Sequence, residues 1–248
     1  MTGRFSGKTA LVTGGAGGIG AAICRRLAAE GAQVVICDLN AKAAAALAGE
    51  ICSASVERVD IADGAAARAM IERVVAAHGR LDVLCNNAGV NRRGDLLSLT
   101  EVDWMASFAI NLHGMFHLCR AVLPHMIEAG GGAIVNTASQ WGLYPAPGHI
   151  AYNTSKAAVA AFTRNLARDY APQKIRVNAV CPGEVRTPML ESNLARTGRS
   201  LDDLNALVPY GRIGEPEEIA ALVAFLASDE APYLCGALVE ITGAQAVA

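Results

Sequence analysis

The sequence predicts an α/β fold: a doubly wound parallel sheet of about seven strands with helices on both faces. Short β-branched runs alternate with longer helical patterns from one end of the chain to the other. Most of these runs are apolar nearly throughout, which is typical of strands that helices cover on both sides. Neither a composition break nor a Pro/Ser-rich linker divides the chain, so we expect a single domain over residues 1–248.

The strand and helix patterns follow one another in a regular order. Strands are expected at residues 9–13, 32–38, 56–60, 82–87, 133–139, 175–180 and 237–241, of which 56–60 is the weakest. Helical patterns cover residues 19–30, 41–50, 64–78, 101–128, 151–170 and 215–228.

Two segments depart from this alternation. Pro124 lies inside the pattern at 101–128, and because proline has no backbone N–H, we expect a bend or an early end of the helix there. Residues 184–214 contain proline and glycine but no strand pattern. In a doubly wound fold, such an insertion near the carboxyl ends of the strands is a candidate substrate lid.

The composition argues against several classes of protein. With 52% hydrophobic residues and a net charge of −2, the chain is too apolar and too evenly charged for intrinsic disorder. It has neither the basic excess nor the basic stripe of a nucleic-acid-binding protein, so we expect no nucleic-acid partner. No apolar stretch approaches the ~18 residues of a membrane helix, so we expect no membrane partner.

The cysteine pattern and the first residues favour a cytoplasmic location. The seven cysteines form no C-x-x-C pair and stand in apolar contexts, which predicts reduced, buried thiols. Thr13 and Gly14 interrupt the apolar run near the N-terminus, so it does not resemble a signal peptide.

A glycine-rich stretch, TGGAGGIG at residues 13–20, follows the first strand and opens the first helix. Its glycines allow a tight turn and a close approach to a pyrophosphate, while the helix N-terminus supplies unpaired N–H groups. The second strand ends in Asp38, 18 residues after Gly20, near the ~20 expected for a carboxylate that binds the adenosine ribose. This context predicts a Rossmann-type dinucleotide site with Gly14, Gly17, Gly18, Ile19 and Gly20 as its loop.

Asp38 also favours NAD as the cofactor. A carboxylate accepts hydrogen bonds from ribose hydroxyls but repels a 2′-phosphate, for which a nearby cation is needed. Gly17 and Leu39, where such a cation is expected, are neutral. Lys42 is the nearest base in sequence, and we assign it to a solvated helix face.

Five further features complete a recognisable set: Ser139 at the end of a strand, YNTSK at 152–156, NNAG at 86–89, Asn111, and CPG at 181–183. Together with the glycine-rich stretch, they resemble the short-chain dehydrogenase/reductase family, NAD-dependent type, in the family's order over essentially the whole chain. The resemblance implies an oxidoreductase that transfers a hydride between NAD and a secondary alcohol or ketone.

The proposed chemistry explains why these residue types are needed. Tyr152 and Lys156 stand at i and i+4 and share one helix face. A lysine ammonium ~4 Å from the phenolate should lower the tyrosine pKa from ~10 by up to ~3 before desolvation subtracts its share. Tyr152 then serves as the general base. By resemblance, Ser139 hydrogen-bonds the substrate oxygen, Lys156 also holds the nicotinamide ribose, and Asn111 anchors a water-linked proton path.

Resemblance also implies further cofactor contacts. Asp60 and Ile61 meet the adenine, and Asn87, Ala88 and Gly89 form a turn against the adenosine ribose. The nicotinamide carboxamide would be held by Pro182, Gly183, Val185 and Thr187. His113 and His117 are spaced as a metal pair, but no acidic residue lies between them and they stand in a long packing helix, so we expect no metal.

The substrate is expected to be a polar small molecule. The candidate contacts are Ser139, Gln140, Trp141, Tyr144, His149 and Glu184. Their long polar groups favour a sugar, a polyol or a hydroxy acid over a plain alcohol. Five loop arginines lie where they would approach an anionic substrate group, although solvated arginines are the simpler interpretation: Arg92, Arg93, Arg186, Arg196 and Arg199.

Two alternatives stay open at this stage. One is a 3-oxoacyl-thioester reductase of the same family, against which Asp38 counts because NADPH use would be expected. The other is a non-catalytic NAD-sensing protein, against which the presence of Ser139, Tyr152 and Lys156 counts. The resemblance and the apolar surface of the helices at 101–128 and 151–170 further predict a homotetramer.

Overall fold

The computed structural model of the chain describes residues 3–245, without the side chains of residues 195–197. Its sheet is parallel and has seven strands in the order β3-β2-β1-β4-β5-β6-β7. The strands are β1 (Thr9–Thr13), β2 (Gln33–Cys37), β3 (Ala54–Glu57), β4 (Val83–Asn86), β5 (Gly132–Thr137), β6 (Ile175–Pro182) and β7 (Leu238–Ile241). The predicted doubly wound Rossmann-type fold is confirmed, and its order reverses between β1 and β4, where such folds bind ligands.

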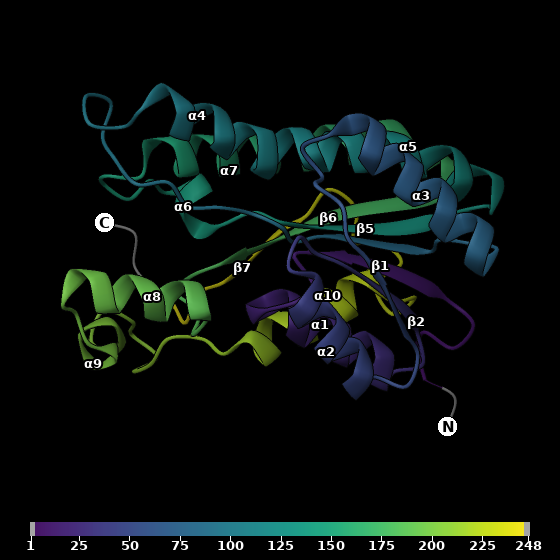
Figure 1. Cartoon of the computed structure of the whole chain (residues 1–248), viewed down its shortest axis with the longest axis horizontal. Helices are drawn as coiled ribbons and strands as arrows, with labels where there is room; N and C mark the ends of the chain where they lie inside the picture. Colours follow the sequence, from purple (N-terminus) through teal and green to yellow (C-terminus); the bar gives the residue numbers. More distant parts are fainter. Residues whose placement is uncertain (1–2, 246–248) are drawn as a thin grey trace.

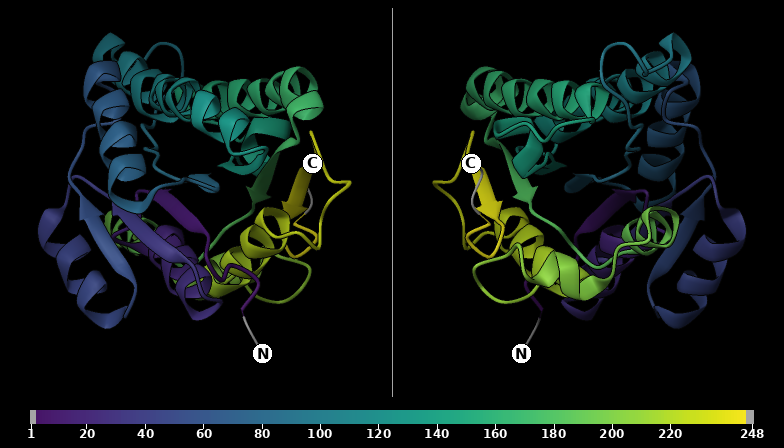
Figure 2. Two further views of the ribbon diagram at one scale, coloured as in Figure 1. Left: turned by 90° about the vertical axis from the view of Figure 1, so that its right-hand side faces the viewer. Right: turned by 90° about the vertical axis from the view of Figure 1, so that its left-hand side faces the viewer.

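Helices cover both faces of this sheet. They are α1 (Gly18–Ala29), α2 (Ala41–Glu50), α3 (Gly64–His78), α4 (Glu101–Phe108), α5 (Gly114–Glu128), α6 (Gln140–Leu143), α7 (Ile150–Tyr170), α8 (Pro188–Thr197), α9 (Leu201–Asn205) and α10 (Pro216–Ala227). One face carries α1, α2 and α10, and the other carries α3, α4, α5 and α7 (Figure 1). The end-on views show the two helical layers with the sheet between them (Figure 2).

Two separate hydrophobic cores, one on each face of the sheet, explain why nearly every residue of the strands is apolar. Along β1, Ala10 and Val12 belong to the cluster that also contains residues of α1 and α10. Leu11, between them, belongs to the opposite cluster with residues of α3, α5 and α7. Since successive side chains of a strand point to opposite faces, both faces must be apolar when both are covered.

Three local expectations need correction. The weakest strand, β3, ends at Glu57 and begins before the predicted 56–60. The helical pattern at 101–128 contains a π-helical turn, Ala109–His113, between α4 and α5. The helix does not end early at Pro124 but continues to Glu128. Arg120, the residue whose carbonyl loses its partner to Pro124, is exposed, so water can satisfy that carbonyl.

The thiols are also less uniformly buried than expected. All seven cysteines are free, but Cys52 and Cys235 are exposed. Both lie in loops, one after α2 and the other before β7, so neither helical layer covers them. Among the described residues, we find no helix with both the length and the apolar character to span a bilayer.

The segment 184–214 leaves the carboxyl end of β6 and forms α8 and α9, at the left end of Figure 1. Backbone hydrogen bonds of 2.9 and 2.8 Å join its two ends, from Gly214 N to Glu184 O and from Arg186 N to Gly214 O. Leu194, Leu204, Val208 and Ile213 form a small cluster of their own within the segment. The segment therefore carries a core separate from the two cores of the sheet.

One glycine of the loop after β1 tests how tightly this region is packed. A Cβ on Gly20 would lie 2.0 Å from the backbone oxygen of Gly14, whereas one on Gly17 would meet nothing within 4 Å. We predict that Gly20→Ala lowers the free energy of unfolding by about 1–3 kcal/mol, as overpacking does. Gly17→Ala is the matched control and should stay within about 0.5 kcal/mol of the parent in urea denaturation. Equal stability of the two variants would contradict the predicted clash.

Candidate active site

The glycine-rich loop joins β1 to α1 at the point where the strand order reverses. Gly14 and Gly18 adopt positive φ angles of 60° and 52°, a conformation that side chains disfavour. Gly17 caps the N-terminus of α1, and within residues 3–245 we find no side chain that caps that end of the helix. The unpaired N–H groups there suit an anion such as a phosphate.

Asp38 lies directly beside this loop, because β1 and β2 are neighbours in the sheet. Its carboxylate accepts a hydrogen bond of 3.0 Å from the backbone N–H of Ala16 and one of 2.9 Å from that of Asn40. Leu39 next to it is 57% exposed and offers no charge. The structure thus places the Asp38 carboxylate at the predicted ribose position. The neighbouring positions 17 and 39, where a cation would be needed for NADP, hold the neutral residues Gly17 and Leu39.

The loop after β4 is bound to the loop after β1. Thr13 Oγ1 accepts hydrogen bonds of 3.1 Å from the backbone N–H groups of Asn87 and Ala88. In return, Asn87 Nδ2 donates to the backbone oxygens of Thr13 and Gly14, each at 3.2 Å. These four bonds hold the two loops together along one rigid edge.

A cavity of about 280 Å³ opens along these loops toward α7. Ten of the residues predicted to bind the cofactor line it: Gly14, Gly17, Gly18, Ile19, Asn87, Ala88, Gly89, Tyr152, Lys156 and Thr187. Its lining combines glycines, which leave room for a ligand, with the N-terminus of α1, which suits an anion, and with the hydroxyl of Tyr152 and the ammonium of Lys156. These residues fit a dinucleotide.

The remaining predicted cofactor residues lie elsewhere. Pro182, Gly183 and Val185 line a second, larger cavity. Gly20, Asp38, Asp60 and Ile61 line neither cavity. Asp60 is exposed after β3, and Ile61 packs against Gly114 at the start of α5.

Lys156 is buried where α7 crosses β5. Only 4% of it is exposed, and its ammonium donates a 2.6 Å hydrogen bond to the backbone oxygen of Thr137. Burial lowers the pKa of Lys156 to about 8. Among the described residues, the backbone oxygen of Thr137 is the hydrogen-bond acceptor that holds this cation, whose charged form burial disfavours.

The pKa of Tyr152 is shifted upward, whereas the sequence predicts that it is lowered. Burial raises the pKa of its phenol, the hydrogen-bonding Ser139 hydroxyl lowers it, and the Glu184 charge raises it further. Lys156 Nζ lies 5.8 Å from the centre of the tyrosine ring. The expected lowering of the tyrosine pKa by a lysine at ~4 Å is not found, because burial is the largest effect on this phenol and Lys156 is not among the groups that shift its pKa.

Asn111 occupies the π-helical turn between α4 and α5. Its Oδ1 accepts a 2.8 Å bond from the N–H of Val90, while its Nδ2 donates to Val90 O at 3.0 Å and to Ser155 Oγ at 2.9 Å. A Cβ on Gly89 would lie 3.2 Å from Asn111 Oδ1 and 3.4 Å from Lys156 Nζ, so both groups face the same point. Such π turns are frequent at functional sites.

The larger cavity, of about 470 Å³, adjoins the first. The two cavities share Ile19, Thr137, Tyr152, Thr187 and Met189 in their linings. Of the predicted substrate contacts, Ser139, Gln140, Trp141 and Glu184 line the larger one. The Tyr152 hydroxyl therefore belongs to a place where molecules bound in the two cavities would meet.

Two predicted substrate contacts are not part of that lining. Tyr144 ends α6 and is 42% exposed. His149 is buried behind Trp141, with the two rings 4.6 Å apart, and its Nδ1 lies 3.0 Å from Asn91 Oδ1. Burial lowers the pKa of His149 to about 4, so the imidazole is neutral near pH 7.

Of the five loop arginines, some line the larger cavity and others do not. Arg92 and Arg93 line the larger cavity. Arg186 pairs instead with Glu191 at 3.4 Å. Burial raises the pKa of Glu184, and the charge of Arg199 partly offsets that rise. The side chain of Arg196 lies outside the described residues.

Sequence reasoning missed two residues of this site. Asn91 lines the larger cavity and contacts His149; its place directly after the NNAG stretch is a signal that points to it. Gln245 accepts a 2.7 Å hydrogen bond from Gln140 Nε2 across 105 positions. Nothing near Gln245 in the sequence indicates that contact.

Comparison with known proteins agrees with this geometry. Residues 8–197 match the family model described as short chain dehydrogenase. D-threitol dehydrogenase of Mycolicibacterium smegmatis is 43% identical, over 97% of this chain and 93% of that protein. A 3-oxoacyl-[acyl-carrier-protein] reductase of Thermotoga maritima is 39% identical, over 97% of this chain and 98% of the relative.

Solved structures show the same similarity. The 3-ketoacyl-(acyl-carrier-protein) reductase of Brucella melitensis, crystallised with NADH, superposes with a TM-score of 0.90 at 32% identity. The match covers 97% of this chain and 98% of that one. The chain belongs to the short-chain dehydrogenase family, and it is an oxidoreductase with a nicotinamide dinucleotide as its cofactor.

Proposed function

We propose that the protein is an NAD-dependent dehydrogenase that moves a hydride between NAD and a secondary alcohol or ketone of a polar small molecule. The observation that carries this proposal is the position of Tyr152, which lines both cavities and has Ser139 within hydrogen-bonding range. A sugar, a polyol or a hydroxy acid suits the polar lining of the larger cavity, and one similar protein is named for the polyol threitol.

Each residue has a defined task in this proposal. The nicotinamide ring supplies the hydride acceptor or donor when it is bound. Ser139 orients the substrate oxygen, and Tyr152 accepts the hydroxyl proton during oxidation or donates it during reduction. Lys156 lines the smaller cavity with Tyr152 and holds the nicotinamide ribose, while Pro182 and Gly183 form a wall of the larger cavity beside the reacting oxygen.

NAD rather than NADP is proposed as the cofactor, because Asp38 lies beside the glycine loop. We predict that NAD binds at least about tenfold more tightly than NADP, a difference of ~1.4 kcal/mol. Fluorescence titration of both cofactors measures this difference. Asp38→Asn removes the charge that repels a 2′-phosphate and keeps the amide oxygen, so the preference should shrink in that variant. Equal affinities in the parent protein would refute the assignment.

Tyr152 is proposed as the general acid–base group. We predict that Tyr152→Phe abolishes turnover and leaves the NAD dissociation constant nearly unchanged, since the ring is kept and only the proton acceptor is lost. Because burial raises the phenol pKa, oxidation by the parent protein should become faster as the pH rises. Lys156→Ala is the comparison and should weaken both catalysis and NAD binding. Activity of Tyr152→Phe within tenfold of the parent would exclude the role.

Reduction of 3-oxoacyl thioesters is the second candidate, because two of the similar proteins carry such a name. One of them was crystallised with NADH, so an NAD preference alone does not separate the two functions. The polar groups of Gln140 and Glu184 in the cavity lining favour a polar substrate over an acyl chain. A non-catalytic NAD sensor is disfavoured because Ser139, Tyr152 and Lys156 are all present.

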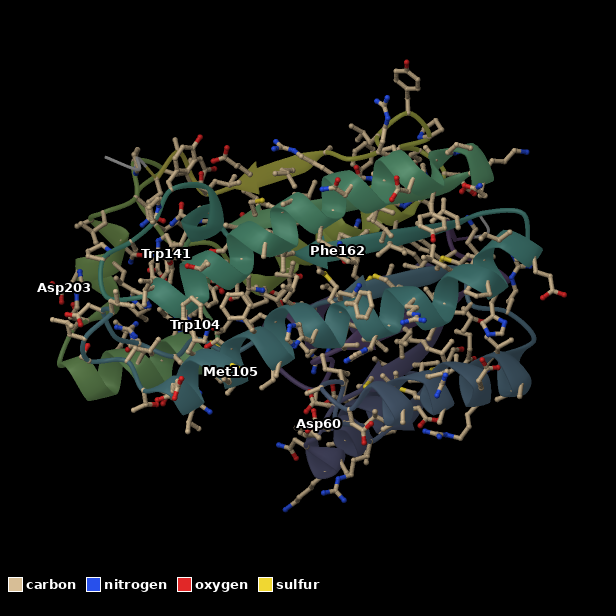
Figure 3. The ribbon with its side chains drawn as sticks, turned by 90° about the horizontal axis from the view of Figure 1, so that it is seen from above. Asp60, Trp104, Met105, Trp141, Phe162 and Asp203 are labelled. Carbon is tan, nitrogen blue, oxygen red and sulfur yellow. The ribbon has the colours of Figure 1, made fainter. Side chains whose placement is uncertain are left out.

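We further propose a cytoplasmic homotetramer. Met105 lies on α4 and Phe162 on the neighbouring α7 (Figure 3). Val102, Met105 and Phe116 are 78%, 60% and 41% exposed, which leaves apolar surface along α4 and α5. We predict a tetramer mass by light scattering at micromolar concentration, and Met105→Glu should shift it toward smaller species. A stable monomer of the parent protein would contradict the assembly.

Residues 184–214 are proposed as a lid that orders over bound substrate. Met189 on α8 is 57% exposed and lines both cavities, and Gly198 and Gly211 adopt positive φ angles that suit hinges. We predict fast hydrogen exchange in this segment without ligand and protection once NAD and a substrate analogue are bound. Equal protection in both states would mean a fixed pair of helices instead.

A further inference from the structure

One carboxylate lies in the larger cavity beside the proposed reaction centre. Glu184 follows Gly183 at the end of β6, and it lines the cavity together with Ser139 and Tyr152. Its charge reaches the Tyr152 phenol strongly enough to affect the pKa of that phenol. Among the described residues, we find no hydrogen bond to the Glu184 side chain, and its place in the cavity lining puts it within reach of a ligand.

A second acceptor lies next to it, and its orientation follows from the hydrogen bonds around it. Gln245 Oε1 accepts a hydrogen bond of 3.4 Å from the backbone N–H of Glu184, which identifies this atom as the amide oxygen. Gln140 Nε2 donates to the same oxygen at 2.7 Å. The other end of the Gln140 amide is therefore Oε1, which is buried and lacks a donor among the described residues.

Gln140 Oε1 is buried close to the chain segment that carries Glu184. Gln140 Oε1 lies 3.3 Å from the position of a Cβ on Gly183, the residue before Glu184. Gln140 itself follows Ser139, whose hydroxyl is proposed to meet the substrate oxygen. A substrate group that reaches these acceptors is thus attached close to the reacting carbon and not at the far end of the molecule.

The local charge indicates which kind of donor fits. Burial raises the pKa of Glu184, while the nearby guanidinium groups of Arg93 and Arg199 lower it and favour the carboxylate. The same two cations disfavour a third positive charge beside them. A neutral hydroxyl donor therefore suits this corner of the cavity better than an ammonium group.

We propose that Glu184 and Gln140 accept hydrogen bonds from a hydroxyl on the carbon next to the reacting carbinol, so that the substrate is a vicinal diol. This inference rests on the proposed function. In the oxidation, the carbinol C–H passes as a hydride to NAD, its O–H proton passes to Tyr152, and the neighbouring hydroxyl is unchanged. The products are an α-hydroxy ketone, NADH and one proton.

The inference also accounts for the unpaired Gln140 oxygen. A buried acceptor without a donor costs free energy, and a substrate hydroxyl supplies that donor. The atoms that cover Oε1 in the ligand-free chain must move aside when the hydroxyl binds, and the recovered hydrogen bond favours this movement.

A matched pair of alcohols tests the inference. Butane-2,3-diol and butan-2-ol share one carbon skeleton and differ only in the neighbouring hydroxyl. We expect kcat/KM for the best diol stereoisomer to exceed that for butan-2-ol by about 10- to 100-fold, the range of a hydrogen bond to a charged group. The same preference is expected in reduction with NADH, for 3-hydroxybutan-2-one over butan-2-one.

Three variants connect the preference to the two residues. Glu184→Leu and Gln140→Leu should bring the ratio of the two kcat/KM values toward one, while Glu184→Gln, which keeps an acceptor, should retain part of it. Glu191→Leu, on the same segment but outside the cavity lining, is the control and should keep the parental ratio. Diol binding to the Tyr152→Phe variant with NAD, measured by calorimetry, reports affinity without turnover and should weaken in the Leu variants.

The outcomes separate this inference from the proposed function. Equal oxidation of both alcohols by the parent protein, or a preference that survives both Leu variants, overturns the inference and leaves the dehydrogenase function standing. A preference for 3-aminobutan-2-ol over the diol also overturns it, since the acceptors would then serve a cation. Oxidation of neither alcohol, nor of C4–C6 polyols, with NAD still bound, contradicts the proposed function and the inference together.

Discussion

The site depends first on the hydrogen bonds that join the loops after β1 and β4. These strands are neighbours in space, although their sequences are separated by two other strands and three helices. Thr13 and Asn87 exchange backbone and side-chain hydrogen bonds across the point where the strand order reverses. Because both loops are held there, the glycines that leave room for a dinucleotide keep their places relative to α7.

A buried polar chain performs a similar task between the sheet and α7. Asn86 Nδ2 donates to Asn136 Oδ1, and Asn136 Nδ2 donates to Thr163 Oγ1, each at 2.9 Å. All three side chains are buried, so each of these bonds forms without competition from water. They set the position of the helix that carries Tyr152 and Lys156 against the strands that end at the cavity.

Burial then determines the electrostatics of the pair. It raises the pKa of Tyr152 and lowers that of Lys156, so both charged forms are disfavoured in the ligand-free chain. Such opposing shifts are characteristic of sites where protons move. The Glu184 charge raises the Tyr152 pKa further, which connects the proposed substrate contact to the ionisation of the proposed general base.

The sequence by itself determined the α/β class, the strands and the longer helices of the sheet layers to within a few residues, and the set Ser139, Tyr152, Lys156 and Asp38, but not the helices α6, α8 and α9. These features depend on local hydrophobic periodicity and on motifs formed by residues that are close together in the sequence. Only the tertiary structure decided that Tyr144 and His149 lie outside the cavity lining, that Lys156 turns toward Thr137, and that Gln245 orients Gln140. Contacts between residues far apart in the chain, and the burial that shifts a pKa, arise from packing, which no stretch of sequence encodes alone.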